Sequence, residues 1–302
     1  MTDTITLLSG EKKKLTRSDG VELTLVSTGS HEARVYVSPY NRRIQVLGQR
    51  TKDYERLARD LASLAEINDL TKVFLKARES EIAAFQDQGY IREAKICGYF
   101  NGQDAHVLSR FLSSSRLQPS STDSDRQNLE ELIKKTAASR ERALEPEFTC
   151  RLAESSDVAP LAALYGKTFA SYPFPVDNPE YVRKTMKTHV VYRIVTNSKG
   201  TILAAASGET NKELGHAEMT DFATTPEARG HGLATYLLTE LEEDMRSRGI
   251  VNLHTLSRAG MAPMNAVFQS LGYRFTGTLI KNCSIGGKFE DMHCWCKQLG
   301  PK

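Results

Sequence analysis

Apolar residues recur at two spacings in the second half of the chain, and the two spacings alternate. The β-branched run Val190–Thr196 is typical of a strand, and Glu218–Thr224 is predicted to be another. Leu237 and Leu241 repeat at the spacing of one helix face, before a stop at Gly249. The other elements predicted here are strands over 148–152, 201–207, 251–256, 273–282 and 288–297, and helices over 155–169, from 178, and over 263–271. This order predicts a mixed α/β fold with a partly antiparallel sheet.

The first half shows a fainter version of the same order. The patterns predict helices over 54–65 and 80–88, and strands over 72–76, near 96 and near 107. The run Phe85-Gln-x-x-Gly89-Tyr90 matches Phe268-Gln-x-x-Gly272-Tyr273 letter for letter. The match predicts a weak internal repeat. The alternative is that this run is a common helix ending that recurs by chance.

A Ser- and Thr-rich segment separates the two halves. Residues 113–124 have neither a helical nor a strand period, which is typical of a linker. A polar, helix-like stretch follows over 125–146. We therefore predict an N-terminal α/β domain over 1–112, a linker and connecting helix over 113–146, and a second domain over 147–302.

Composition excludes several classes of protein. Of the 302 residues, 40% are hydrophobic and 25% are charged, which excludes wholesale disorder. A net charge of +3 gives no argument for a nucleic-acid partner, and no apolar run approaches the roughly 18 residues of a membrane helix. The five cysteines include no C-x-x-C pair, so we expect a reduced, cytoplasmic chain without a bound metal.

A glycine-rich loop carries the strongest chemical signal. It follows a predicted strand and opens a predicted helix, with the sequence Arg229-Gly230-His231-Gly232-Leu233-Ala234. Its small residues let backbone N–H groups approach a ligand, and a helix N-terminus attracts negative charge. The loop predicts a pyrophosphate cradle with His231 beside the phosphates. The alternative is an ordinary strand–helix turn, while the spacing disfavours a dinucleotide fingerprint or a P-loop.

This run resembles the coenzyme-A loop of the GNAT acetyltransferase superfamily, whose pattern is Gln/Arg-x-x-Gly-x-Gly/Ala. The order of elements over about 148–298 agrees with that fold. The resemblance implies acetyl-CoA as co-substrate, with direct transfer in a ternary complex. It also implies a mixed, mostly antiparallel sheet with flanking helices. From its own pattern, the smaller α/β domain before this fold is predicted to be a degenerate half-repeat.

A closer resemblance is to bacterial and archaeal beta-lysine N-acetyltransferases, which make the compatible solute Nε-acetyl-beta-lysine. The segments that carry it are Tyr172-Pro-Phe-Pro175, Glu218–Thr224, Met264-Asn265, Asn282–Trp295, Tyr40-Asn-Arg-Arg43 and Tyr99-Phe-Asn-Gly102. Two runs depart from that family. Its usual Asn-Asn-Thr stands here as Lys281-Asn282-Cys283, and its terminal Trp-Tyr-Lys as Trp295-Cys296-Lys297.

The resemblance also implies roles in catalysis. At neutral pH only about one lysine-type amine in a thousand is deprotonated, so a general base helps, and Glu218 stands where the superfamily often places one. A backbone N–H near Phe222 or Ala223, with Thr224 beside them, would meet the thioester oxygen. Asn265 would bind pantetheine. The superfamily's usual tyrosine acid is replaced by Phe268, which leaves Tyr273, Tyr236 and Tyr172 as candidates.

Five further residues are candidates for binding the substrate. They are Arg258, as a guanidinium fork for a carboxylate, the loop residues Tyr172 and Phe174, and Asp221 and Asn282. In a regular strand Asp221 faces away from Glu218, and only a bulge would bring the two to one side. For Arg258 a salt bridge, and for Phe174 a core position, are the alternatives.

These observations favour an acetyl-CoA-dependent N-acetyltransferase that acts on the side-chain amine of a free diamino acid, with beta-lysine first. The alternatives are a polyamine, peptide or antibiotic acceptor, and a non-catalytic module that senses coenzyme A. We expect a small-molecule amine as partner and neither nucleic acid nor membrane, with a homodimer left open. The first half has no counterpart of the 229–234 loop, so we predict that it binds no coenzyme.

Overall fold

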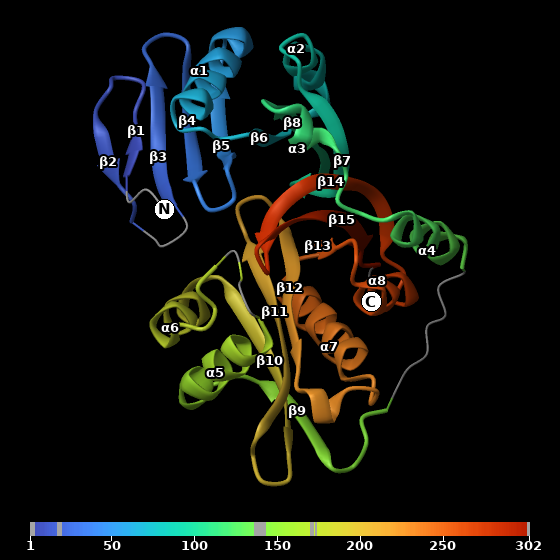
Figure 1. Ribbon diagram of the computed structural model, residues 1–302. Coiled ribbons are helices and arrows are strands. Elements are labelled where there is room, and N and C mark those ends of the chain that lie inside the picture. The colour runs from blue at the N-terminus through green and yellow to red at the C-terminus, as the bar shows by residue number, and fades with distance from the viewer. Residues whose placement is uncertain (1–3, 17–19, 136–142, 170–171, 173, 301–302) are drawn as a thin grey trace.

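A computed structural model describes residues 4–16, 20–135, 143–169, 172 and 174–300, and it contains two large sheets (Figure 1). The N-terminal sheet is formed by β3 to β8. The elements of this half are β1 (Thr4–Thr6), β2 (Lys12–Lys14), β3 (Val21–Ser27), β4 (His31–Ser38), β5 (Arg43–Thr51), α1 (Tyr54–Ile67), β6 (Lys72–Ala77), η1 (Glu79–Glu81), α2 (Ile82–Gln86), β7 (Ile91–Phe100) and β8 (Gln103–Phe111).

The C-terminal sheet is formed by β9 to β15. Two short helices connect the halves, α3 (Ser114–Leu117) and α4 (Asp123–Lys134). The remaining elements are β9 (Phe148–Leu152), η2 (Ser155–Asp157), α5 (Val158–Thr168), α6 (Pro179–Thr188), β10 (Val190–Asn197), β11 (Ile202–Asn211), β12 (His216–Thr224), η3 (Pro226–Ala228), α7 (Leu233–Ser247), β13 (Asn252–Arg258), α8 (Ala262–Ser270), β14 (Arg274–Ile285) and β15 (Lys288–Gln298).

The two sheets share one topology. The N-terminal order is β3-β4-β5-β6-β8-β7, and the C-terminal order is β10-β11-β12-β13-β15-β14 with β9 added at its edge. Each contains a single parallel pair, β5–β6 or β12–β13, and a long helix connects the strands of that pair. Phe85 meets Tyr90 edge-on at 5.3 Å between ring centroids, as Phe268 meets Tyr273. The shared topology supports the predicted repeat.

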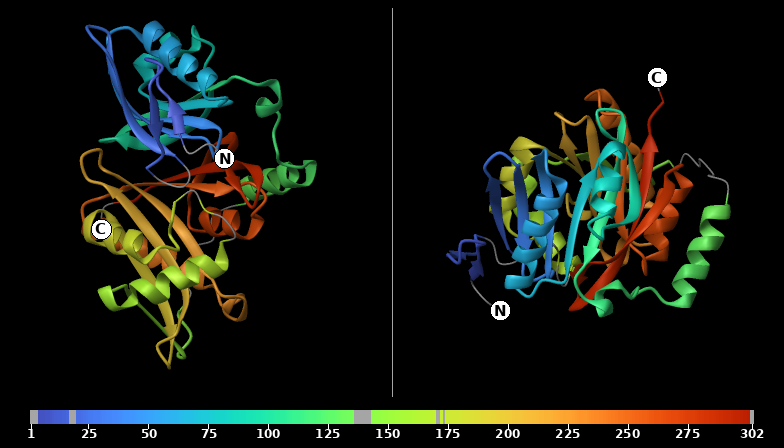
Figure 2. Two further views of the ribbon diagram at one scale, coloured as in Figure 1. Left: turned by 60° about the vertical axis from the view of Figure 1, so that its left-hand side comes forward. Right: turned by 90° about the horizontal axis from the view of Figure 1, so that it is seen from above.

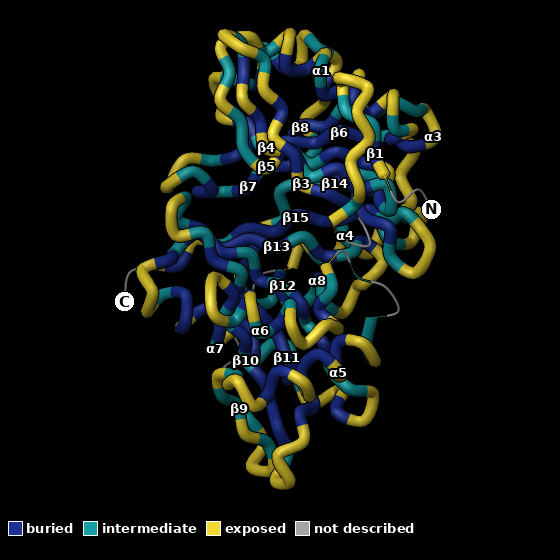
Figure 3. The backbone as a smooth tube through the Cα atoms, turned by 90° about the vertical axis from the view of Figure 1, so that its left-hand side faces the viewer, coloured by how far each residue is buried: buried dark blue, intermediate teal, exposed yellow. Residues whose placement is uncertain are grey.

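Helices cover both faces of the C-terminal sheet (Figure 1). One face packs against α7 and α8 around Met219, Leu241 and Phe268, and the other packs against α5 and α6 around Tyr165 and Ile194. Figure 3 shows the buried backbone following the strands, with exposed positions gathered at the loops. The fold is thus the mixed, mostly antiparallel sheet with flanking helices that was expected. No helix in the described ranges is long and apolar enough to cross a membrane.

The N-terminal sheet packs directly on the C-terminal one. One of its faces is covered by α1 and α2, and the other contributes Phe74 and Ile96 to a core shared with β14 and β15. Figure 2 shows this hairpin lying against β7. The backbones come so close that a Cβ atom added at Gly277 of β14 would lie 2.2 Å from the Glu93 carbonyl oxygen of β7. The interface is therefore a packed core.

The connecting segment corrects two predictions. Its Ser-rich part contains the turn α3, and Ser120 and Ser121 donate hydrogen bonds to the Asp291 carboxylate. The following helix runs over Asp123–Lys134 and not over 125–146, of which 136–142 lie outside the described residues. Leu129 and Leu132 are the part of its apolar stripe that packs on the C-terminal core, and helices in proteins depend on such packing.

Five strands, β1 to β5, were not predicted. Buried and exposed residues alternate along β3 and most of β4, for example in the run Val-Glu-Leu-Thr-Leu at Val21–Leu25. This alternation was a readable signal of a half-buried strand. Without these strands, the elements predicted for the first half were too few to match those of the second half.

Candidate active site

The glycine-rich loop connects β12 to α7, as predicted. Gly230 and Gly232 have φ values of +91° and +73°, in the left-handed region that favours glycine. Gly232 is the N-cap residue of α7 and offers no side chain to cap the helix. The N-cap residue therefore provides no side-chain acceptor for the first backbone N–H groups of α7. This is the arrangement in which a helix N-terminus binds a phosphate group.

The side chains of this loop lie in two environments. Arg229 is exposed, whereas Leu233 is buried in the core beneath the loop. His231 is oriented by Glu145, whose carboxylate lies 2.9 Å from its Nδ1 atom, and its ring meets Phe148 edge-on. The His231 ring thus has two partners within the chain, and its predicted contact with a phosphate group stays a prediction.

The strands β12 and β13 separate directly before this loop. They pair in parallel over three residues only, with Glu218 opposite His254 as the last pair. Beyond this point Ala223 and Thr224 pair with β11. Within the described residues, β13 has no residue in register with Phe222, Ala223 or Thr224. The edge of β12 that faces β13 is therefore open where a thioester and pantetheine were predicted to lie.

A bulge brings Asp221 to the same side as Glu218. One extra residue of β12 lies between the pairs Ser207–Thr220 and Ala205–Ala223, and Asp221 itself has a φ of +55°. A bulge reverses the alternation of side chains along a strand. The expectation from a regular strand is therefore wrong, and the bulged alternative is correct.

Glu218 is a carboxylate with a neutral-range pKa. Its side chain is 32% exposed, and its Oε2 atom lies 3.7 Å from Nε2 of the buried His254. Burial, followed by the charge of Glu209, raises the pKa of Glu218 to about 7, while Lys76 acts in the opposite direction. Burial also lowers the pKa of His254 well below its usual value, so that ring is neutral. Such a carboxylate can accept a proton near neutral pH.

Lys76 of the N-terminal sheet completes this group of charges, and the sequence analysis did not single it out. It lies near the end of β6, with Nζ 5.1 Å from the centre of the Tyr99 ring. Burial lowers the pKa of Lys76, but Tyr99, Glu218 and Glu209 together leave it raised. A charged residue within the buried strand Lys-Val-Phe-Leu-Lys-Ala was a signal that could have found it.

The predicted loop residue Tyr172 reaches the same face of β12. Its hydroxyl lies 3.3 Å from the Thr220 hydroxyl, and its ring stacks on Phe169. Asp221 accepts a hydrogen bond of 2.6 Å from Ser207. Burial raises the pKa of Asp221, while hydrogen bonds from Ser207 and Tyr172 lower it. Tyr172, Asp221 and Glu218 are therefore brought together, whereas Phe174 is 40% exposed and does not fill the core.

Two predicted residues, Arg258 and Asn265, have partners within the fold. Arg258 donates to Glu290 over 2.8 Å, so the salt bridge weighed against its carboxylate role is present. Asn265 donates to the Arg258 and Met261 carbonyl oxygens and accepts from Trp295 Nε1. Both binding roles stay predictions, now beside a structural role.

Asn282 lies at a different place from Glu218. Its carbonyl oxygen accepts a hydrogen bond from Arg43, which is in register with Lys72 on β6. Lys72 and Lys76 are four residues apart on one strand, a span of about 13 Å. The structure therefore places Asn282 against the N-terminal sheet, at the far end of β6 from Lys76.

The position at which the superfamily usually has a tyrosine acid holds a buried phenylalanine. Phe268 is buried and meets Phe222 and Tyr273 edge-on. Tyr273 is buried beside Glu242 on the α7 side of the sheet, and burial raises its pKa well above the usual value. Tyr172 is the candidate among the three that lies beside Asp221.

Comparison with known proteins shows the family to which the chain belongs. Residues 160–273 match the model of the acetyltransferase (GNAT) family. The chain is 39% identical over 262 residues to the N-acetyltransferase YodP of Bacillus subtilis, covering 86% of this chain and 94% of that protein. The chain belongs to the GNAT acetyltransferase family. It is an amine N-acetyltransferase, and the family uses acetyl-CoA.

Two further relatives of this GNAT enzyme have a named acceptor. A beta-lysine N(6)-acetyltransferase of Methanococcus maripaludis is 33% identical over 267 residues, covering 88% of this chain and 96% of that protein. One of Methanosarcina mazei is 31% identical over 266 residues, covering 82% and 98%. All three similarities extend beyond the matched GNAT segment, so the N-terminal sheet is part of what these proteins share.

Proposed function

We propose that this GNAT enzyme acetylates the side-chain amine of a free diamino acid, with beta-lysine as the substrate. The observation that carries the proposal is the position of Glu218. Its carboxylate, with a pKa of about 7, ends the β12–β13 pairing and lies just before the uncapped N-terminus of α7. The proposed base therefore lies on the strand that leads into the proposed coenzyme-A loop.

The reaction follows from these positions. The substrate ammonium gives a proton to Glu218, and the free amine attacks the thioester carbon of acetyl-CoA. A C–N bond forms, the C–S bond breaks, and coenzyme A leaves as a thiolate that takes up the proton lost by the acetylated nitrogen. We assign the stabilisation of the oxyanion to a backbone N–H group of Phe222 or Ala223, in the part of β12 beyond its pairing with β13.

The charges around Glu218 suit an amino acid better than a simple diamine. Lys76 offers a cation for the substrate carboxylate, and no carboxylate lies within 4 Å of its Nζ among the described residues. Glu209 and Asp221 offer acceptors for the second ammonium group. Both are close enough to Glu218 that their charges raise its pKa. A polyamine has no group that would use Lys76. This complementarity, with the names of the two archaeal relatives, supports beta-lysine.

The product of this reaction has the charge of a compatible solute. Acetylation removes the ammonium at the end of the chain, so a cationic diamino acid becomes a zwitterion without net charge. We propose that the product serves in this role. The test is to measure whether the acetylated product accumulates in cells that are shifted to high salt.

The experiment that tests the activity is thiol release from acetyl-CoA by the full chain. The acceptors are beta-lysine, alpha-lysine, 1,4-diaminopentane and spermidine. 1,4-Diaminopentane is beta-lysine without its carboxylate, so the pair isolates that group. We expect the highest kcat/KM with beta-lysine, and a loss of about tenfold or more without the carboxylate.

The other outcomes distinguish the alternatives. A preference for spermidine would replace the acceptor while leaving the base and the coenzyme site in place. Tight binding of acetyl-CoA without transfer to any amine would instead indicate a protein that senses coenzyme A.

A further inference from the structure

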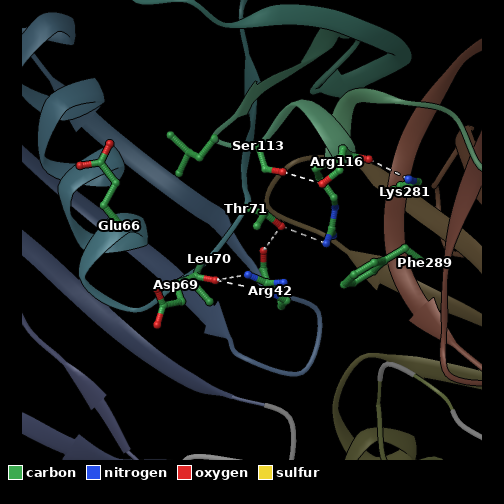
Figure 4. Close-up of a pocket in the computed structure, with 11 residues that line it drawn as sticks. Arg42, Glu66, Asp69, Leu70, Thr71, Ser113, Arg116, Lys281 and Phe289 are labelled. Atoms are coloured by element: carbon green, nitrogen blue, oxygen red, sulfur yellow. Dashed lines mark hydrogen bonds between the residues drawn. The ribbon is translucent and has the colours of Figure 1, made fainter.

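A second pocket lies outside the active site, where the two sheets and their connection meet. Its volume is about 440 Å³. It is lined by the end of α1 and the loop that leads from α1 to β6, by α3, and by the β14–β15 hairpin (Figure 4). Three cations, Arg42, Arg116 and Lys281, come to it from three separate parts of the chain.

Arg116 is buried in this pocket, and no acidic side chain of the described residues forms an ion pair with it. Only 3% of the residue is exposed, and its guanidinium lies 3.7 Å from the centre of the Phe289 ring. It donates to the Thr71 hydroxyl and to the Asn41 carbonyl oxygen, both neutral groups. Its Nε atom is buried and has no hydrogen-bond acceptor among the described residues.

The other cations of the pocket also bond only neutral oxygens. Arg42 donates to the Asp69 carbonyl oxygen, and Lys281 donates to the Ser115 carbonyl oxygen over 2.7 Å. No carboxylate of the described residues lies within 4 Å of the cationic nitrogen atoms of Arg42, Arg116 or Lys281. Burial, followed by the charge of Arg43, lowers the pKa of Arg116, and Arg42 acts in the same direction, while Cys283 and the more distant Glu93 carboxylate act in the opposite direction.

An uncompensated buried charge is costly, because it gives up hydration without gaining a partner. Guanidinium groups bind the oxygen atoms of phosphate and carboxylate groups through two parallel N–H donors. Glu66 and Asp69 line the α1 side of the pocket, away from Phe289, as Figure 4 shows. An anionic group is therefore directed toward the Arg116 side.

We propose that this pocket binds a small metabolite through an oxyanion group, a phosphate or a carboxylate, held by Arg116, Arg42 and Lys281. The bound anion supplies the missing negative charge. Because the three cations belong to different parts of the chain, the anion also stabilises the packing of α3 between the two sheets. This site is separate from the Arg229–Ala234 loop and does not depend on the identity of the acetyl acceptor.

The test is calorimetric titration of the full chain with inorganic phosphate and, separately, with acetate, at fixed ionic strength. Saturating coenzyme A is present so that the glycine-rich loop is already occupied. We expect one saturable site per chain for at least one of these anions. Arg42→Met and Lys281→Met each weaken binding about tenfold or more, whereas Lys288→Met, exposed on the same hairpin, changes it less than about twofold.

Arg116→Met is expected to abolish binding, and its circular dichroism melt shows whether the variant is folded. Binding of phosphate but not acetate would identify a phosphorylated metabolite, and the reverse would identify an organic acid. The absence of saturable binding by both anions would overturn the proposal. Binding that persists unchanged in Arg42→Met and Lys281→Met would overturn it as well, because the anion would then lie elsewhere.

Discussion

The two sheets of this enzyme have the same strand order, yet they differ at the one place where the chemistry is expected. In both, the parallel pair extends over three residues and a bulge follows in the central strand, at Asp221 in β12 and near Leu47 in β5. Beyond the bulge the halves diverge. β12 continues into a glycine-rich loop, whereas β5 is separated from α1 by Lys52 and Asp53 only.

The helix N-termini show the difference most clearly. Asp53 caps α1, and its carboxylate accepts a hydrogen bond from the Arg56 backbone N–H. Gly232 leaves the equivalent end of α7 without a side-chain cap. The N-terminal copy thus fills with its own carboxylate the position where the other copy is open to an anion. This contrast supports the proposal that the N-terminal half binds no coenzyme, and shows that the topology alone does not make the site.

The largest expected effect is the loss of the base. By register, Glu218 of β12 corresponds to Gln45 of β5. Glu218→Gln is expected to lower kcat/KM about 1000-fold, within the usual range for a general base, whereas Gln45→Ala leaves it unchanged. Thiol release with beta-lysine measures both. Equal activity of Glu218→Gln and the wild type would remove Glu218 from the mechanism.

The pH profile gives the same assignment a second test. Only the ionised Glu218 accepts a proton, and its pKa is about 7. The kcat/KM of the wild type should therefore fall as pH decreases below about 7, and stay level above it until the free amine titrates. A profile without a transition near neutral pH would contradict the assignment.

The next effect comes from giving the C-terminal copy the cap of the N-terminal copy. Gly232→Asp places a carboxylate at the N-terminus of α7, where it competes with phosphate groups. We expect the Kd for coenzyme A to rise about 30-fold or more, since like charges brought together cost several kcal/mol. Gly232→Asn is the matched control, because asparagine also tolerates a positive φ but carries no charge. Equal Kd values for the two variants would indicate strain and not charge.

A smaller effect is expected at Lys76, where the N-terminal copy contributes to the active site. Lys76→Met removes the cation that faces Glu218, so the transition of the pH profile should move above about 7. The KM for beta-lysine should rise about tenfold or more, with little change for 1,4-diaminopentane. Arg is the conservative replacement that should restore part of the affinity. Equal losses for both acceptors would argue against a carboxylate contact.

The smallest effect concerns the N-terminal cap itself. Asp53→Ala removes the acceptor for the Arg56 N–H and should lower the free energy of unfolding by about 1 kcal/mol. Asp53→Gly should cost less, and neither variant should alter the Kd for coenzyme A. Thermal melts and calorimetry measure the two quantities. A change in coenzyme binding would show that this half contributes to the cofactor site.

The sequence by itself determined the family, the glycine-rich loop and most elements of the C-terminal sheet. These are local properties: β-branched runs, glycines that permit positive φ, and the spacing of Leu237 and Leu241 decide them without distant partners. It also contained the alternation of β3 and β4, which was not used.

Only the tertiary structure decided which side chains meet at the site. The bulge at Asp221 reverses the face of every residue after it, and a bulge leaves no fixed mark in sequence. Lys76 and Glu218 are 142 positions apart, and Arg116 and Lys281, which line one pocket, are 165 positions apart. Whether such residues become neighbours depends on how the two packed sheets are oriented. The burial that raises the Glu218 pKa likewise exists only once the chain is packed.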